Sequence, residues 1–333
     1  MSFEEILMKA LASVKQEDVL HDYTPLLVVY KDGSIQRFFG NHSVPPSFDT
    51  VTGVESKDII ISPETGVYVR MYKPRSIQVG EKVSLLVYFH GGGFVLESAS
   101  SPQYHSYLNA LASKANVICV SVDYRIAPEH PLPAAYEDSW AALEWVVKGL
   151  AGDEPWLKEH VDPARVFLAG DSAGGNIAHH MAMRLGSSCD TSVKLVPRGI
   201  VMVHAYFWGT DRIGSELQKL TASERSPQGS LLDRLWKFAS PGTSGSDDPM
   251  INPGMDPELG KLAAEKLLIF VAEKDLLRDR GFYYKEALLK SGWKGEVDVI
   301  ETAEANHIFH LLNPASPDAA HLMDQFVAFL NSS

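Results

Sequence analysis

Six short apolar runs recur along most of the chain, separated by segments of mixed polarity. They span residues 83–90, 117–124, 166–172, 200–206, 267–272 and 297–300. Between them, apolar residues return every three or four positions, which is the spacing of amphipathic helices. The clearest helical segments are 136–147, 174–185 and 281–290. Strands that are nearly continuously apolar and alternate with helices are typical of a mainly parallel sheet covered on both faces, so the pattern predicts an α/β fold.

Shorter elements are expected before this alternation begins. Residues 1 to about 45 predict an acidic helix followed by a hairpin, which turns at Asp32-Gly33 between two apolar runs. Asp-Gly in that setting is a strong signal for a tight turn between strands. Residues 58–74 predict a second pair of short strands around a turn at 62–66.

The segment 208–253 interrupts the alternation of strands and helices. It is largely polar, carries an amphipathic helical pattern at 231–238, and then runs through serine, proline and glycine clusters at 240–249. An insertion of this kind after a buried strand predicts a lid over the carboxyl ends of the strands, and an ordinary surface excursion is the alternative. We expect one domain over 1–333, with a cap formed by 208–253 and residues 1 to about 45.

Two glycine-bearing turns each follow an apolar run. The first, Gly-Asp-Ser-Ala-Gly at 170–174, matches the turn that raises a serine nucleophile between a strand and a helix. Glycines flank the serine because a Cβ there would collide with the strand or the helix. The second, His-Gly-Gly-Gly-Phe at 90–94, can direct backbone N–H groups at a reacting oxygen. Together they predict a nucleophile, Ser172, and an oxyanion hole on one sheet.

A serine hydroxyl needs a base to take its proton, and the base needs a third group to orient it. In hydrolases built on this serine turn, the order along the chain is serine, acid, histidine. Asp275 follows the apolar run 267–272, so it is the expected acid. Asp279 is an alternative, but it falls within the next predicted helix. His307 and His310 both follow the last run, and their positions alone leave either as the base.

These motifs give the chain a specific resemblance. It resembles plant carboxylesterases of the hormone-sensitive-lipase-like group, which is related to gibberellin receptors and 2-hydroxyisoflavanone dehydratases. The resemblance covers about residue 20 to the C-terminus. Its motifs are HGGGF at 90–94, DYRIAPEHPLPAA at 123–135, GDSAGGN at 170–176, KDLLRDR at 274–280 and HIF at 307–309. It implies an α/β-hydrolase fold with an N-terminal cap and no cofactor.

Carried over residue by residue, the resemblance assigns the catalytic roles. It implies that Ser172 is the nucleophile, Asp275 the orienting acid and His307 the base, with His310 structural. The implied oxyanion donors are the backbone amides of Gly92, Gly93 and Ala173, with Gly91 as an alternative to one of them. Aromatic residues that we expect to line the substrate pocket are Phe94, Tyr206, Phe207, Trp208 and Phe309.

Other polar residues near the motifs are expected to be structural. We expect Asp171 to form a buried ion pair with Arg125, and His90 to brace the glycine loop. His179 and His180 follow the serine turn on a predicted helix, where a packing role is expected.

The amino-acid composition limits the kinds of binding partner that we expect. The net charge is −12, and no basic cluster is present, so neither nucleic acid nor an anionic membrane is expected as a partner. The two cysteines, Cys119 and Cys189, give neither a disulfide framework nor metal-ligand spacing, and we expect no metal. The N-terminal residues lack the pattern of a signal peptide, so a cytoplasmic location is expected. A monomer or weak homodimer is expected.

The sequence therefore predicts a serine carboxylesterase that hydrolyses small-molecule esters through an acyl-enzyme. One alternative is a dehydratase or cyclase of plant specialised metabolism, which would use the same base and oxyanion hole. Another is a hormone receptor. The receptors resemble the enzymes but lack the base histidine, whereas His307 is present in this chain.

Overall fold

A computed structural model describes residues 12, 14, 16–187, 193–226 and 229–332. The predicted N-terminal acidic helix lies outside the described residues, apart from positions 12 and 14, and so does Cys189.

A nine-stranded sheet forms the centre of the molecule, in the order β12-β11-β10-β9-β7-β8-β6-β5-β4. All pairings from β8 to β12 are parallel, and only the β6-β5-β4 end is antiparallel. The strands are β4 (Phe48–Asp49), β5 (Val54–Ser62), β6 (Val67–Pro74), β7 (Val83–Phe89), β8 (Ile118–Asp123), β9 (Val161–Asp171), β10 (Gly199–Val203), β11 (Lys266–Ala272) and β12 (Glu296–Thr302). The six apolar runs are the six parallel strands, which confirms the predicted α/β fold.

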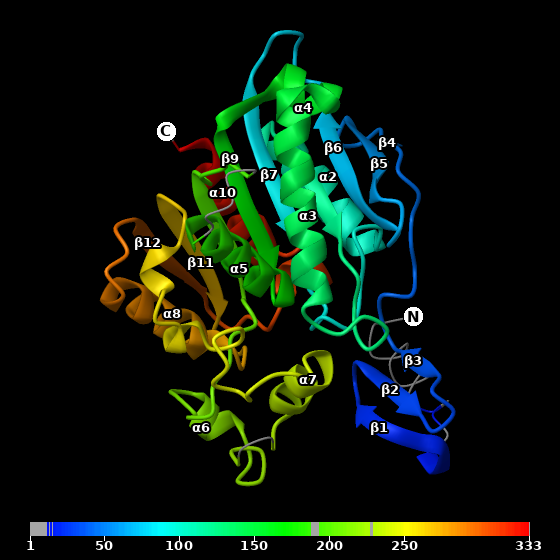
Figure 1. Cartoon of the computed structure of the whole chain (residues 1–333), viewed down its shortest axis with the longest axis vertical. Helices are drawn as coiled ribbons and strands as arrows, with labels where there is room; N and C mark the ends of the chain where they lie inside the picture. Colours follow the sequence, from blue (N-terminus) through cyan, green and yellow to red (C-terminus); the bar gives the residue numbers. More distant parts are fainter. Residues whose placement is uncertain (1–11, 13, 15, 188–192, 227–228, 333) are drawn as a thin grey trace.

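Helices cover both faces of this sheet (Figure 1). On one face α3, α5 and α8 pack against alternate strand residues such as Leu85 and Val87, and on the other α2 and α10 pack against Leu86 and Tyr88. All four strand residues have no exposed surface, which explains why the central parallel strands are largely apolar. The edge strand β12, by contrast, is partly exposed and carries Asp298 and Glu301. The helices are α2 (Pro102–Ala115), α3 (Ala134–Lys148), α4 (Pro155–His160), α5 (Ala173–Ser187), α6 (Glu216–Lys219), α7 (Leu231–Ala239), α8 (Arg278–Lys290), α9 (Phe309–Leu312) and α10 (Pro317–Asn331).

The two predicted hairpins are present. β2 (Leu27–Tyr30) and β3 (Ile35–Arg37) pair in antiparallel fashion around the Asp-Gly turn, where Gly33 has a φ of 86°. β1 (Val19–Tyr23) adds a third strand to this small sheet, which is separate from the large one. β5 and β6 form the second hairpin.

The small sheet and the segment 208–253 lie side by side, beyond the carboxyl ends of β7 and β9 (Figure 1). The helix predicted at 231–238 is α7. Its Phe238 ring lies 4.5 Å from the ring of Tyr23, and Arg234 donates to the carbonyl oxygen of Asp22 at 3.2 Å. Two stretches that are distant in sequence thus meet over the edge of the sheet where the glycine-bearing turns lie.

Two buried ion pairs anchor the segment 208–253. Arg280 on α8 donates to both carboxylate oxygens of Glu216 on α6, at 2.6 and 2.8 Å. Arg212 pairs with Asp233 on α7, which also accepts from the indole of Trp208 at 2.9 Å. All four charged side chains are at most 3% exposed. Since removing one partner of a buried pair leaves an uncompensated charge, these contacts hold the segment in place.

Candidate active site

Ser172 occupies the sharp turn between β9 and α5, with a φ of 51°. A positive φ is strained for a residue with a side chain and persists where the surroundings enforce it. A Cβ on Gly170 would lie 2.6 Å from the carbonyl oxygen of Phe89, and one on Gly174 would collide with the same oxygen. The packing of this turn against β7 therefore explains both glycines of the motif.

The structure brings Ser172, His307 and Asp275 together. Ser172 Oγ lies 3.1 Å from His307 Nε2, and His307 Nδ1 lies 2.7 Å from Asp275 Oδ2. Asp275 is buried and also accepts from the amide of Leu277 at 3.0 Å. A carboxylate at Nδ1 requires the proton on that nitrogen, which leaves Nε2 of the neutral ring free to accept from the serine hydroxyl.

Backbone contacts hold the loop after β11, which carries Asp275 (the acid loop), against the loop after β12, which carries His307 (the base loop). Glu273 N–H donates to Thr302 O at 3.0 Å, and Lys274 N–H donates to Ala305 O at 2.9 Å. From the segment 208–253, Lys219 donates to the carbonyl oxygens of Glu273 and Asp275, at 3.0 and 2.8 Å. The relative position of the two loops is therefore fixed independently of the Asp275–His307 hydrogen bond.

The electrostatics of the pair favour an ionised acid. Burial alone would raise the pKa of Asp275, but the charge and hydrogen bond of His307 outweigh it and lower that pKa. Burial likewise acts to lower the pKa of His307, yet the charge and hydrogen bond of Asp275 and the charge of Asp171 raise it above its ordinary value. The imidazolium that forms when His307 takes a proton is thus stabilised by the carboxylate beside it.

Asp279 and His310, the alternative candidates for the acid and the base, lie in other surroundings. Asp279, on α8, accepts from the amide and hydroxyl of Ser215, at 2.8 and 2.5 Å. His310 is 1% exposed, packs edge-on against Tyr107, and has no hydrogen-bond partner for either ring nitrogen within the described part of the chain. Burial and the nearby histidines lower the pKa of His310 well below its ordinary value, so its ring is neutral.

His204 is a site residue that the sequence reasoning missed. It directly follows β10, and Val203 pairs with Asp171, so His204 aligns with the nucleophile across the sheet. Its ring lies 5.7 Å from the ring of His307, and its Nδ1 accepts from the amide of Ile308 at 3.0 Å. Burial and the charge of His307 lower its pKa to about 3. A polar residue at the carboxyl end of an apolar run was the available signal.

The glycine loop presents two amides in the conformation expected of an oxyanion hole. Gly92 and Gly93 have φ values of 108° and 62°, and a Cβ on Gly93 would lie 2.8 Å from a methyl group of Leu235. Among hydrogen bonds of the described residues, none engages the amides of Gly92 or Gly93. The amide of Gly91, by contrast, donates to the hydroxyl of Tyr104 at 2.8 Å. Ala173, the third predicted donor, begins α5, where helix amides are unpaired.

His90 contacts the loop in the way that was predicted. Its Nδ1 donates to the carbonyl oxygen of Gly91 at 2.8 Å, and its ring stacks on Tyr124 at a centroid distance of 4.1 Å. Burial lowers its pKa to about 4, so the ring is neutral at physiological pH.

The predicted ion pair between Asp171 and Arg125 is wrong. Arg125 pairs instead with Asp138, with N–O distances of 2.8 and 2.9 Å. Asp171 has no exposed surface and accepts from the hydroxyls of Tyr88 and Tyr104, at 2.9 and 2.8 Å. Neutral hydroxyl donors from both sides replace the arginine that we expected.

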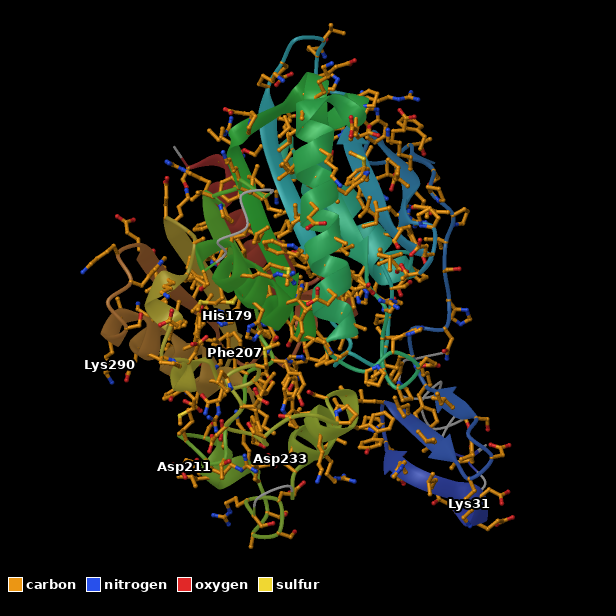
Figure 2. The ribbon with its side chains drawn as sticks, in the orientation of Figure 1. Lys31, His179, Phe207, Asp211, Asp233 and Lys290 are labelled. Atoms are coloured by element: carbon orange, nitrogen blue, oxygen red, sulfur yellow. The ribbon has the colours of Figure 1, made fainter. Side chains whose placement is uncertain are left out.

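The five predicted pocket residues fall into two groups. Phe94 is buried against Tyr206, and the amide of Tyr206 donates to Ser172 O at 2.8 Å. Phe309 lies 5.6 Å from the ring of His204. Phe207 instead packs edge-on against His179 (Figure 2), and the indole of Trp208 binds Asp233. The members of the first group contact Ser172, Tyr206 or His204, whereas the second group packs against α5 and α7.

One set of donor atoms could be considered for a metal ion. His204, Asp275 and His307 each offer an atom within 4.8 Å of the others. The Asp275 oxygen and His307 Nδ1 already share a hydrogen bond, and His204 Nδ1 accepts from an amide. A cation would have to replace these contacts, so the absence of a metal requirement stays our prediction.

Comparison with known proteins extends this picture. A family model described as an alpha/beta hydrolase fold matches residues 86–311. The chain is 47% identical over 318 residues to Probable carboxylesterase 2 of Arabidopsis thaliana, covering 95% of this chain and 98% of that protein. It is 42% identical to Tuliposide A-converting enzyme 1, chloroplastic, of Tulipa gesneriana, covering 94% and 78%. A hyperthermophilic esterase from Pyrobaculum calidifontis superposes with a TM-score of 0.68 at 28% identity, covering 83% and 85%.

Proposed function

Because the chain belongs to the plant carboxylesterases of the hormone-sensitive-lipase-like α/β-hydrolases and is a carboxylic ester hydrolase, we propose that it cleaves small-molecule esters through an acyl-enzyme. Ser172 is the nucleophile, His307 the base and Asp275 the orienting acid. The observation that supports this most directly is the continuous hydrogen-bonded line from Ser172 Oγ through both nitrogens of His307 to the Asp275 carboxylate.

In the first half of the reaction, His307 Nε2 takes the proton of Ser172 as Oγ bonds to the ester carbonyl carbon. The tetrahedral intermediate then loses its alkoxide, which receives that proton from His307 and leaves as the alcohol. A water molecule repeats the sequence on the acyl-enzyme, which releases the acid and restores Ser172. Asp275 stays ionised and stabilises the imidazolium in both halves.

The amides of Gly92, Gly93 and Ala173 bind the oxygen that becomes negative in the tetrahedral intermediate. Donors fixed in advance stabilise that charge without having to reorient during the reaction. The left-handed conformations of Gly92 and Gly93 support this assignment, as does the position of Ala173 at a helix N-terminus.

The chain is one domain, 1–333, and the cap over its site comes from residues 1 to about 45 and from 208–253. Two contacts support a cap that reaches the glycine loop. Leu235 of α7 packs against Gly93, and Arg37 of β3 donates to the carbonyl oxygen of Val95 at 2.7 Å. In this proposal Phe94, Tyr206 and Phe309 line the pocket for the ester, whereas Phe207 and Trp208 pack against α5 and α7.

The reaction class is tested by following oxygen from solvent. Turnover in ¹⁸O-water is expected to place label in the released acid, since water attacks the acyl-enzyme. Activated esters are expected to give a burst of alcohol whenever deacylation is slow. A native substrate that gave an unlabelled product, with no burst from activated esters, would instead support the alternative of a dehydratase or cyclase. That alternative is kept because one relative is named for converting tuliposide A. A hormone receptor without turnover is disfavoured by the intact hydrogen bonds of His307.

The base also predicts a pH profile. A protonated His307 cannot accept the serine proton, so kcat/KM is expected to fall about tenfold for each pH unit below the His307 pKa. Because that pKa is raised, the midpoint is expected above the ordinary value of about 6.5. His204 and His310, with lowered pKa values, stay neutral in the pH range of this limb. Asp171 has a pKa of about 6, so the tenfold slope is expected above that pH, where its carboxylate stays mostly charged. Initial rates with a non-ionising ester between pH 5 and 9 measure the limb, and a midpoint under 6 would contradict the assignment.

The proposal also includes the cellular location, the oligomeric state and the binding partners of the enzyme. We place it in the cytoplasm as a monomer or weak homodimer, with small-molecule esters as its partners and no nucleic acid or membrane surface. Through the described ranges, no helix is long and apolar enough to cross a membrane. The relative from Tulipa gesneriana is chloroplastic by name, so fractionation of plant tissue is the direct test of location.

A further inference from the structure

The residue before the nucleophile carries a buried carboxylate that the mechanism does not use. Asp171 has no exposed surface, and its two oxygens each accept from one tyrosine hydroxyl. Tyr88, on β7, donates to Oδ1 at 2.9 Å, and Tyr104, on α2, donates to Oδ2 at 2.8 Å. Both tyrosines are themselves buried.

The two tyrosines differ in one contact. The hydroxyl of Tyr104 also accepts from the amide of Gly91 at 2.8 Å, whereas the only partner described for the Tyr88 hydroxyl is Asp171. A line of hydrogen bonds thus runs from Asp171 through Tyr104 to the first glycine of the loop. The fit is close, because a Cβ on Gly91 would collide with Asp171 Oδ2 and lie 2.9 Å from Tyr104 Oη.

The direction of these bonds distinguishes the amide of Gly91 from the amides of Gly92 and Gly93. The N–H of Gly91 points inward to Tyr104, and its carbonyl oxygen accepts from His90. With both polar groups of Gly91 bound, the chain turns at Gly92 and Gly93, whose amides have no partner among the described hydrogen bonds. The hydrogen bonds of Gly91 therefore fix the backbone from which the amides of Gly92 and Gly93, the two proposed oxyanion donors, are oriented.

We propose that Asp171 and Tyr104 are positioning residues for the oxyanion hole: the carboxylate orients the Tyr104 hydroxyl, which holds the Gly91 amide and so aims the amides of Gly92 and Gly93. This inference rests on the proposed function of those two amides.

The ionisation of the groups agrees with this arrangement. Burial raises the pKa of Asp171 to about 6, although the hydrogen bonds from Tyr104 and Tyr88 oppose that rise, so the carboxylate is charged at pH 8. Burial and the charge of Asp171 raise the pKa of both tyrosines well above the ordinary value, so both hydroxyls keep the protons that they donate. Hydrogen bonds to a charged acceptor are the stronger kind.

The chain offers a matched pair of variants. Tyr104→Phe and Tyr88→Phe each remove one hydroxyl from the same carboxylate, but only the first breaks the contact with Gly91. At pH 8, Tyr104→Phe is expected to lower kcat about 10- to 100-fold, below the cost of deleting a donor outright, because both amides remain but are no longer aimed. Tyr88→Phe is expected to stay within about threefold of wild type, and KM is expected to change little in either variant.

A second readout separates aiming from general damage. A trifluoromethyl ketone forms a tetrahedral adduct whose oxyanion occupies the hole, so its inhibition constant should rise in Tyr104→Phe by the same factor as kcat falls. Titration with a fluorophosphonate corrects every rate for the active fraction. Equal effects of the two variants, or an unchanged inhibition constant in Tyr104→Phe, would overturn the inference. If Tyr104→Phe does not fold, Asp171→Asn takes its place with the same expected correlation.

The proposed triad and the positioning role of Tyr104 can be refuted separately. Fluorophosphonate that labels a residue other than Ser172, or not at all, refutes the proposed triad. Label at Ser172 with identical Tyr104→Phe and Tyr88→Phe kinetics refutes only the positioning role.

Discussion

Replacing Ser172 with alanine is expected to lower kcat for ester hydrolysis by about 10⁴- to 10⁶-fold, because the members of a triad act as a unit and the loss of one removes the covalent route. The activity that remains would come from substrate binding and the oxyanion amides, which still stabilise direct attack by water. Alanine keeps a Cβ at the φ of 51° and adds no bulk, so the turn between β9 and α5 is expected to survive.

Three measurements check this result. Single-turnover and steady-state rates with a p-nitrophenyl ester give the loss of activity, and the melting temperature confirms that the fold is retained. Mass spectrometry after fluorophosphonate treatment should map the label to Ser172 in wild type and find none in the variant. Turnover that survives the substitution, or label on another residue, would show that the nucleophile lies elsewhere.

The sequence was sufficient for those parts of the fold and site that local patterns encode. The six apolar runs correspond to the six parallel strands, because strands buried on both faces have few polar positions; only the edge strand β12 is partly exposed. Ser172 could be located because the clash with Phe89 O forces glycine at both flanking positions. Asp275 and the two candidate bases, His307 and His310, could be expected near Ser172 because groups after different parallel strands meet at the same edge of the sheet, whereas the choice of His307 came from the resemblance.

Contacts between elements that are distant in the chain could not be predicted from local sequence patterns. The hydrogen-bond partners of Asp171 are Tyr88 on β7 and Tyr104 on α2. Neither tyrosine belongs to a sequence motif that predicts a hydrogen bond to a carboxylate. Charge complementarity suggested Arg125, which instead forms an ion pair with Asp138. His204 was missed for a related reason, since its contact with the amide of Ile308 depends on how β10 and the base loop are placed in space.

The missed residues lie where the backbone around the site is strained. Ser172, His204 and Ile308 are all non-glycine residues with φ near 50°, and all belong to the loops that carry or contact the triad. Strained backbone of this kind persists only when surrounding contacts over-determine it. The buried hydrogen bonds of Asp171 and His204 supply such contacts, so the residues that sequence patterns cannot reveal are the ones that hold the site in shape.

The second large effect is expected from the base, and the chain supplies its own control three positions away. His307→Gln is expected to lower kcat by about 10⁴-fold or more, because glutamine cannot take a proton from Ser172 at neutral pH. His310→Leu is expected to stay within about threefold, since neither nitrogen of His310 has a described partner and an apolar replacement of a buried polar group of similar size can be nearly neutral.

The pH profile makes the comparison decisive. His310→Leu should keep the acidic limb of kcat/KM at the wild-type midpoint, because the ring that titrates there is His307, hydrogen-bonded to Asp275 at 2.7 Å. His307→Gln should lose that limb, and its residual rate should instead rise with hydroxide concentration. If His310→Leu lost the acidic limb and His307→Gln kept it, the base would be His310 and not His307. That outcome would require the base loop to rearrange around Ile308, whose amide His204 holds in the described structure.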